Sequence, residues 1–481
     1  MKTLLLAVIF AAAGAAQENP ELPTVPEAPA PLKTEEPKAE PKKLPRPSLN
    51  PDAPPAPSKP KKEKEVKAEE GEAPDVSAPK VGPASLEAEW AFLKEATEDP
   101  VEGTRAACLD DLRLFAQQHP DSPLAAEALA ASAALLEKQG DVKGALVENL
   151  RLIYEYPDSK PGQRAVAAYQ KLSDRKLGRK QKEAVAGLAV APEKGDQAQR
   201  LAQLVWGLAE TGAEALYEPA VAEVRRFQAR FPGHPAADKI QWSLAGLHAK
   251  NHKTSEALLA YRKLLAVYTA SALRPQAFDA VGGLYAEQLR DPRQAIKAYE
   301  ELVAQYPKSE LVMSALEKSS ALYADKLKEY ASAVRLDNEI IKLFPKTDGA
   351  LRAFQHEAKL QRDRMDLPED AVATYRRLAI QFGAPDAVDA LQNAADVARR
   401  SLKNYKLEAE LRRKVAQDYP EAKTAADQLF AAAGIFESDL QDEEKAMEVY
   451  REVAVKFSGH RAAQKANERV AKFEKKKQAA P

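Results

Sequence analysis

Residues 282–307 read GGLYAEQLRDPRQAIKAYEELVAQYP, and one spacing within this stretch decides the fold. Ala295 is followed by Tyr299 after four residues, by Leu302 after seven and by Tyr306 after eleven, with Pro307 directly behind. Offsets of 0, 4, 7 and 11 place four side chains on one face of an α-helix. Because proline cannot continue a helix, the stretch predicts an amphipathic helix of about 14 residues that ends just before Pro307.

The aromatic residue at the end of this helix recurs along the chain at a nearly constant interval. An aromatic or imidazole residue, usually followed by proline, occurs at His119, Tyr156, Phe231, Tyr268, Tyr306, Phe344, Phe382, Tyr419 and Phe457. The intervals are 37, 75, 37, 38, 38, 38, 37 and 38 residues, and 75 is one doubled interval. A period between roughly 20 and 50 residues is typical of stacked repeats. The sequence therefore predicts a repeat array.

The inward face of each repeat can be read from the same spacing. Most of these marks have an alanine eleven residues earlier, at positions 145, 220, 257, 295, 333, 371 and 446. Bulky apolar residues follow seven residues after each alanine, as Leu152, Phe227, Leu264, Leu302, Ile340, Leu378 and Val453. Ser122, Ser159, Ser309 and Thr347 stand two residues after the proline position, where a hydroxyl can cap the next helix. Each unit is thus predicted to be helix, turn, helix, turn.

We expect about ten such helix pairs between Leu86 and Phe457, followed by a terminal helix from about His460 to Lys476. A small residue facing a bulky one lets two helices approach closely, and the remaining apolar edge is buried only against the next pair. One unit, about residues 158–194, is degenerate, because Ala191-Pro192 stands where the aromatic mark belongs. Three glycines also weaken its helices, at positions 162, 178 and 187. This unit is predicted to be a bend or a hinge.

The repeat resembles the tetratricopeptide (TPR) repeat. Its pattern of small and bulky residues is matched by Gly282, Tyr285, Ala295, Tyr299, Leu302 and Pro307, and again by Ser320, Tyr323, Ala333, Ile340 and Pro345. The period exceeds the usual length of about 34 residues. This longer period and the aromatic-Pro-x-Ser/Thr junction are similar to TPR proteins of the bacterial cell envelope. These include the periplasmic partner of the Tol-Pal system, the TPR component of outer-membrane β-barrel assembly, and scaffolds of polysaccharide export.

The resemblance implies an all-α, TPR-like superhelix that acts as a non-catalytic adaptor for other envelope proteins. In TPR proteins the first helices of the pairs line a concave groove that grips partner segments. By alignment, the groove residues implied here are Asp279, Glu317, Gln355, Lys359 and Arg362. Two features depart from the named relatives: there is no cysteine for lipid attachment at the signal junction, and no coiled-coil segment before the repeats.

The N-terminal segment predicts export. Residues 1–16 carry Lys2, an apolar run and small residues that suit a signal peptide, so we expect a periplasmic location, with the signal either cleaved or kept as an anchor. Residues 17–84 hold half of the 34 prolines and are expected to be a disordered linker that threads the cell wall, recruits a partner or is simply solvated. The predicted repeat domain covers residues 85–476, and residues 477–481 form a tail.

Composition argues against other classes of function. With 71 basic and 72 acidic residues, the chain has no strong positive field for nucleic acid. Cys108, the only cysteine, falls where small core residues occur in other units, so it is expected to pack inside. His248, His252 and Glu256 have a spacing that suits a metal, but His252 falls in an expected turn. The sequence therefore predicts no catalytic residue, no cofactor and no metal ligand.

Three alternatives for the function remain. The chain could be a structural spacer, a scaffold of a polysaccharide export or secretion assembly, or a peptidoglycan-acting enzyme. The enzyme would need a further catalytic domain of about 150 residues, and the repeats leave no room for one. Paired basic residues, such as Arg225-Arg226, Arg376-Arg377 and Arg412-Arg413, alternate with acidic residues and are interpreted as solvated helix faces. The oligomeric state is left open.

Overall fold

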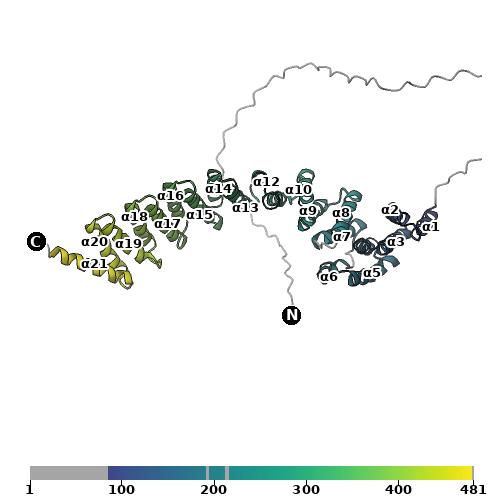
Figure 1. Cartoon of the computed structure of the whole chain (residues 1–481), viewed down its shortest axis with the longest axis horizontal. Coiled ribbons are helices and arrows are strands. Elements are labelled where there is room, and N and C mark those ends of the chain that lie inside the picture. Colours follow the sequence, from purple (N-terminus) through teal and green to yellow (C-terminus); the bar gives the residue numbers. More distant parts are fainter. Residues whose placement is uncertain (1–84, 191–193, 212–215, 479–481) are drawn as a thin grey trace, which may run out of the picture. The chain divides into compact units, whose positions relative to one another are not determined.

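The computed structural model describes residues 85–190, 194–211 and 216–478, and within these ranges all regular structure is helical (Figure 1). The predicted signal peptide, the linker and the Ala191-Pro192 mark lie outside the described residues. The α-helices alternate as first and second helices of ten successive pairs, α1 to α20, followed by α21. The expected helical solenoid is confirmed.

The first part of the chain comprises α1 (Leu86–Ala96), α2 (Glu102–Gln118), α3 (Pro123–Gln139), α4 (Val142–Glu155), α5 (Lys160–Lys176), α6 (Arg179–Val185), the 3-10 turn η1 (Ala186–Leu188), α7 (Gln197–Thr211), α8 (Tyr217–Arg230), α9 (Ala237–Lys250) and α10 (Thr254–Val267). The second part comprises α11 (Arg274–Gly283) with its π-helical continuation η3 (Leu284–Gln288), α12 (Pro292–Gln305), α13 (Leu311–Ala321) with the π-helical η4 (Leu322–Leu327), α14 (Tyr330–Leu343), α15 (Asp348–Asp363), α16 (Pro368–Gln381), α17 (Asp386–Arg400), α18 (Tyr405–Asp418), α19 (Ala425–Ser438), α20 (Glu443–Lys456) and α21 (Arg461–Gln478).

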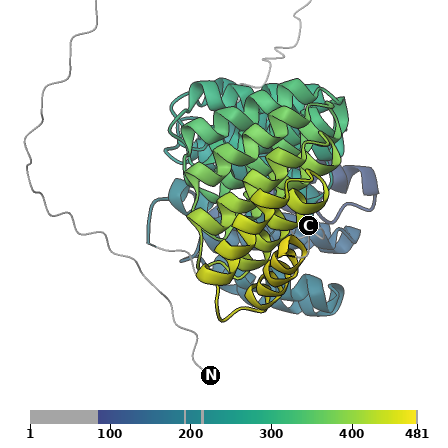
Figure 2. The same cartoon turned by 90° about the vertical axis from the view of Figure 1, so that its left-hand side faces the viewer.

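From α9 onward each helix packs on the next, and neighbouring helices lie side by side in Figures 1 and 2. The alanines at positions 145, 220, 257, 295, 333, 371 and 446 are at most 1% exposed, so the predicted inward face is confirmed. Tyr299 and Leu302, which share that face with Ala295, are 2% and 0% exposed. The predicted caps also form: the Ser122, Ser159 and Thr347 hydroxyls each accept a hydrogen bond from a backbone N–H at the start of the following helix.

The turn between the first and second helix of a pair has the same backbone feature in all six pairs from α9 to α20. A residue with positive φ stands in it at His252, Arg290, Lys328, Asp366, Lys403 and Gln441, at steps of 37 or 38 residues. In the second N-terminal pair the same role falls to Gly140. His252 therefore lies in a turn as predicted, and the helical face that it would share with His248 and Glu256 is broken there.

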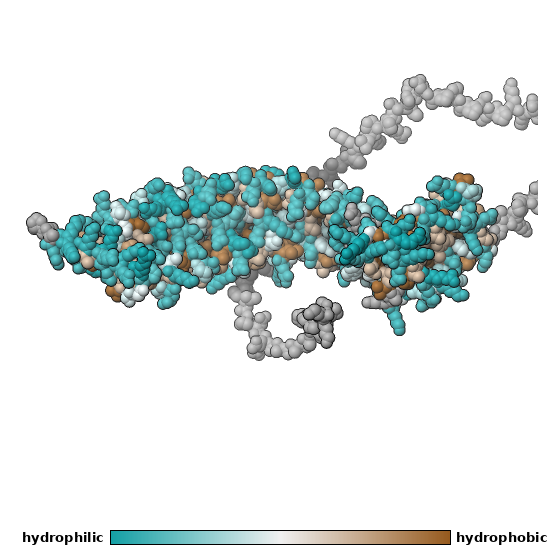
Figure 3. Space-filling model, turned by 60° about the horizontal axis from the view of Figure 1, so that its bottom comes forward, coloured by the Kyte–Doolittle hydropathy of each residue, from teal (hydrophilic) through white to brown (hydrophobic). Residues whose placement is uncertain are grey.

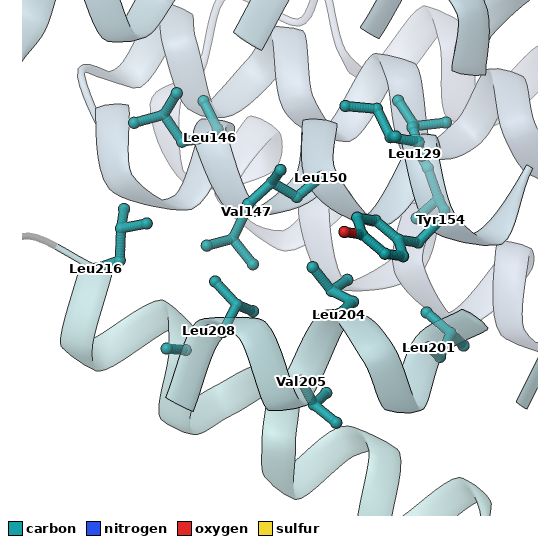
Figure 4. Close-up of a cluster of buried hydrophobic side chains, with 14 of the residues drawn as sticks. Leu129, Leu146, Val147, Leu150, Tyr154, Leu201, Leu204, Val205, Leu208 and Leu216 are labelled. Atoms are coloured by element: carbon teal, nitrogen blue, oxygen red, sulfur yellow. The ribbon is translucent and has the colours of Figure 1, made fainter. Parts of the chain in front are cut away.

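Regular stacking is interrupted at the degenerate unit. α6 has only seven residues, and Val185 is its one buried side chain, so it offers little apolar surface to a neighbour. α7 instead packs against α4, which also contacts α3, α5 and α8. Leu146, Val147 and Leu150 of α4 face Leu204 and Leu208 of α7 (Figure 4). As a result every residue of α4 from Gly144 to Glu155 is buried.

A cluster of charged side chains crosses this buried helix. The Glu148 cluster comprises Glu148, Arg151 and Glu155 of α4, Arg113 of α2, and Glu223, Arg226 and Arg230 of α8. Its three glutamates and Arg151 are at most 3% exposed. Arg151 Nε lies 2.8 Å from Glu155 Oε2 and 3.9 Å from Glu223 Oε1, so one guanidinium serves two carboxylates. These ion pairs join three helices through their charged groups.

The arginines of the cluster favour the charged form of the Glu148 carboxyl. Burial alone would raise the pKa of Glu148, but Arg151, Arg113 and Arg226 outweigh it and hold that pKa below its usual value. The interpretation of basic pairs as solvated faces is wrong for Arg226, which binds buried Glu223, and for Arg412, which binds Glu408. Both arginine side chains are largely covered because their carboxylate partners are buried beneath them.

The outer surface is mostly polar. Figure 3 shows one face on which hydrophilic side chains predominate and apolar ones are interspersed. The most exposed large apolar residues include Leu259, Ile380 and Val455, on α10, α16 and α20. Cys108 is 4% exposed and packs in the core, as predicted. None of the described helices is long and apolar enough to cross a membrane.

Replacing Leu302 by alanine should lower the free energy of unfolding by about 2–5 kcal/mol, because the side chain is fully buried and its removal leaves a cavity. Urea unfolding followed by circular dichroism would measure this. The matched control is Ile380→Ala at a position 82% exposed, where a change below about 0.5 kcal/mol is expected. Equal effects of the two substitutions would show that the inward face is misassigned.

Replacing Arg151 by methionine should destabilise the N-terminal helices by about 3–5 kcal/mol, because it leaves buried carboxylates with too few counter-charges. Amide hydrogen exchange in α4 and α8 would report the loss locally. The control is Arg179→Met in α6, whose ion pair with Glu183 is exposed and contributes little. A stable Arg151→Met protein with unchanged exchange in α4 would contradict the role of the cluster.

Candidate partner-binding face

The five residues implied as groove residues lie on the first helices α11, α13 and α15. Gln355 and Lys359 are exposed on α15, whereas Asp279, Glu317 and Arg362 are half-buried. We call the side of these helices that carries the five residues the first-helix face. The structure brings the five residues onto three successive first helices, and their role in binding remains a prediction.

Ion pairs join neighbouring helices across this face. Asp279 of α11 accepts a hydrogen bond from Lys318 Nζ of α13 at 2.6 Å, and Glu317 of α13 lies 2.7 Å from Arg352 Nη2 of α15. Arg362 pairs with its neighbour Asp363 instead. Because these side chains are partly exposed, each pair contributes little to stability. The two inter-helix ion pairs place acidic and basic side chains alternately along the first-helix face.

One hollow opens beside the Glu317–Arg352 pair. This Asp337 hollow, about 250 Å³ in volume, is formed where α13, α14 and α15 meet. It is lined by Glu317, Ser320, Ala321, Asp337, Ile340, Arg352, Ala353 and His356. Glu317, one of the implied groove residues, therefore stands at a recess in the first-helix face.

At the recess this repeat lacks an aromatic ring that four other repeats have. Four residues after the inward alanine, other second helices carry Tyr261, Tyr299, Tyr375 or Tyr450, and all four rings are buried. In α14 the same position, four residues after Ala333, is Asp337. The ring of Tyr299 packs so closely on Gly282 that an added methyl there would collide with it. The shorter aspartate contacts Ser320, which stands at the position of Gly282, but it supplies no ring.

Polar groups gather around the aspartate instead. Ser320 Oγ donates a hydrogen bond to Asp337 Oδ1 at 2.7 Å, and His356 Nδ1 lies 2.8 Å from Asp337 Oδ2. Ser320 and Asp337 are buried, while a third of the His356 side chain is exposed. The hydrogen bond to Asp337 raises the pKa of His356, although partial burial opposes this. Asp337 and Asp325 support the raised pKa, and Lys359 acts against it.

Serine, histidine and aspartate together invite comparison with a hydrolase triad, but their order is different. In a triad the histidine stands between the nucleophile and the acid and uses a different ring nitrogen for each. Here His356 Nδ1 is the nitrogen nearest both partners, and Ser320 donates its proton directly to the aspartate. Ser320 is also 1% exposed. The geometry is that of a buried polar network, with no activated nucleophile.

Sequence reasoning did not identify this network. Ser320 and Ile340 were assigned to packing positions, while Asp337 and His356 were not singled out. Comparison of the repeats with one another could have identified Asp337, because four other units have tyrosine at the equivalent position. His356 becomes part of the network only through its contact with Asp337 of the preceding pair. Sequence spacing within one unit does not reveal such a contact.

Comparison with known proteins agrees with the repeat assignment. A family model described as a tetratricopeptide repeat matches residues 280–309. A comparison with curated proteins finds no match. Similar solved structures include a tetratricopeptide repeat protein from Parabacteroides merdae, with 18% identity and a TM-score of 0.30, which covers 58% of this chain and 98% of the other. They also include pilF of Pseudomonas aeruginosa, with 17% identity and a TM-score of 0.27, covering 52% of this chain and 98% of the other. The matched residues run from the end of α11 to the turn after α12, and this segment of the TPR-like solenoid is similar to a tetratricopeptide repeat.

Replacing His356 by glutamine should cost stability in a pH-dependent way. The pKa of His356 is raised in the folded state, so its contribution is fully present below about pH 6.5 and is lost as the pH rises through the folded pKa. We expect a cost of about 1 kcal/mol near pH 5.5 and a smaller one near pH 8.5. Chemical denaturation at the two pH values measures it.

The control for this experiment is the Asp337→Asn background, in which the histidine has lost its charged partner. There the pH dependence of the His356→Gln effect should shrink or change sign, because burial then lowers the pKa of His356 without the Asp337 hydrogen bond to oppose it. A cost that is equal at both pH values in the otherwise unmodified protein would contradict the assigned interaction.

Proposed function

We propose that this chain is a non-catalytic adaptor of the bacterial cell envelope that holds segments of other proteins on its first-helix face. The observation that carries the proposal is the Asp337 hollow. It opens in the first-helix face, where one ion pair joins α11 to α13 and another joins α13 to α15. Helical repeats present extended surfaces suited to binding peptides. The tetratricopeptide match at residues 280–309 supports an interaction role for the neighbouring repeat.

The envelope location is the part of the proposal that rests on sequence alone. Residues 1–16 have the pattern of a signal peptide, and the proline-rich residues 17–84 suit a linker that would let the repeat domain reach partners away from an anchoring point. Envelope TPR proteins of similar repeat length motivate the choice of envelope proteins as partners. A structural spacer would need no recess of this kind.

The proposal is tested by photo-crosslinking in cells. A photoreactive phenylalanine analogue placed at Gln355 or Lys359, both exposed on α15, should capture a partner protein. The matched control is Arg376, which is exposed on the second helix α16. We expect adducts from the two α15 positions at several times the yield from Arg376. We also expect them to contain periplasmic proteins, and to disappear when residues 1–16 are deleted.

Two outcomes would contradict the proposal. Capture from Arg376 alone would move the binding surface to the second helices. Adducts that persist unchanged with cytoplasmic proteins after deletion of residues 1–16 would remove the envelope assignment while leaving the adaptor role in place.

A further inference from the structure

The Asp337 hollow stands where other repeats are filled by their own tyrosine. Tyr299 of α12 and Tyr375 of α16, in the pairs before and after, occupy the equivalent position and are 2% and 6% exposed. We propose that the hollow receives a tyrosine side chain from a partner protein segment lying across the first-helix face. This inference rests on the proposed adaptor function and names the chemistry that the partner must bring.

The apolar walls of the hollow suit an aromatic ring. Ile340 occupies the position of Leu302 in the preceding pair and is fully buried beneath the recess, and Ala353 forms a second buried wall. Ala321 lies at the exposed edge. The hollow is an open recess of about 250 Å³, so a ring placed in it would contact these walls on one side and stay partly exposed on the other. An aromatic residue also provides a large contact area at a small loss of conformational entropy.

The polar end of the hollow favours a phenol over a phenyl ring. Each carboxylate oxygen of Asp337 accepts one hydrogen bond from within the protein, from Ser320 or from His356, and an ionised carboxylate oxygen has capacity for another. A tyrosine hydroxyl can donate to that free capacity. The same pairing already occurs in this chain, where Tyr450 donates its hydroxyl proton to Glu437 Oε2 at 2.9 Å.

A phenylalanine would fill the space but would cover the Asp337–His356 pair without contributing a hydrogen bond. Covering charged groups with an apolar ring removes their contact with water, which is unfavourable. The rim of the hollow carries Glu317 and Arg352, which already form an ion pair. The rim therefore has little preference for charged residues beside the tyrosine in the partner sequence. Selectivity should therefore come mainly from the phenol group.

The occupant that we propose is a tyrosine of another protein. Residues 1–84 of this chain contain no tyrosine, so the N-terminal segment cannot place one in the hollow. The tyrosines of a second copy would all be carried by the repeat region. A separate partner with an accessible tyrosine in an extended or helical segment fits the first-helix face best.

Binding of a small probe tests the hollow directly. The full chain is titrated with N-acetyl-tyrosine amide and, separately, with N-acetyl-phenylalanine amide, and binding is followed by NMR and calorimetry. We expect a dissociation constant in the millimolar range for the tyrosine amide, as for other small fragments, and at least about 5-fold weaker binding of the phenylalanine amide.

Two variants close the hollow in different ways. Ser320→Ala with Asp337→Tyr restores the small-and-tyrosine pairing seen at Ala358 with Tyr375, and it should fill the space from inside. Ala321→Phe covers the mouth from an exposed position and should leave folding unchanged even if the first variant does not fold. Both should weaken binding of the tyrosine amide by at least about 10-fold. The control Arg376→Gln, at an exposed position of α16 outside the hollow, should bind like the unmodified protein.

The results separate this inference from the proposed function. If the amides bind equally, or if Ala321→Phe has no effect on binding, the tyrosine inference is wrong. If crosslinking from Gln355 captures a partner with equal yield in the Ala321→Phe protein, the adaptor role stands and the inference falls. If the probe binds as expected but no partner is captured, the hollow recognises tyrosine and the adaptor proposal falls. Concentration-dependent dimerisation that Ala321→Phe abolishes would also overturn the inference, because a second copy would then be the occupant.

Discussion

The close approach of two helices at a buried alanine is the contact on which this structure depends. In seven repeats that alanine is at most 1% exposed, and the residue seven positions later is bulky, apolar and buried as well. A larger side chain at the alanine would separate the two helices of the pair and displace every contact that follows. Because each pair leaves an apolar edge that only the next pair covers, the same small contact also sets the spacing of the whole array.

Sequence reasoning succeeded where it relied on this contact. The offsets around Ala295 predicted the helix from Pro292 to Gln305, its inward face and the turn after it, because local packing within one pair repeats faithfully. It did not identify the hollow, because Asp337 and His356 lie on different pairs and form a site only when the pairs stack. It also misread Arg226 as solvated, because the partner of that arginine, Glu223, is buried by a neighbouring helix that a one-repeat pattern does not include.

The N-terminal helices are stabilised differently from the regular repeats. In the regular array each helix is stabilised mainly by its nearest neighbours, so the effect of a defect should remain local. α4 is instead enclosed by several helices and carries charges that are paired with α2 and α8. Buried ion pairs of this kind tolerate little displacement, because each charge depends on its partner. These helices are therefore expected to unfold together, whereas the later repeats can lose structure one pair at a time.

The recurrent left-handed turn has a consequence for how the array can vary. Six residues with positive φ stand in equivalent turns as histidine, arginine, lysine, aspartate, lysine and glutamine, and all six are exposed. A residue other than glycine in this conformation costs about 1–2 kcal/mol, yet the six pairs from α9 to α20 each accept one. The backbone at these turns is thus imposed by the packed helices on either side and not by the turn residue. The charge of these exposed turn residues can therefore change by substitution, at steps of 37 or 38 residues along the chain, without disturbing the packing of the helices.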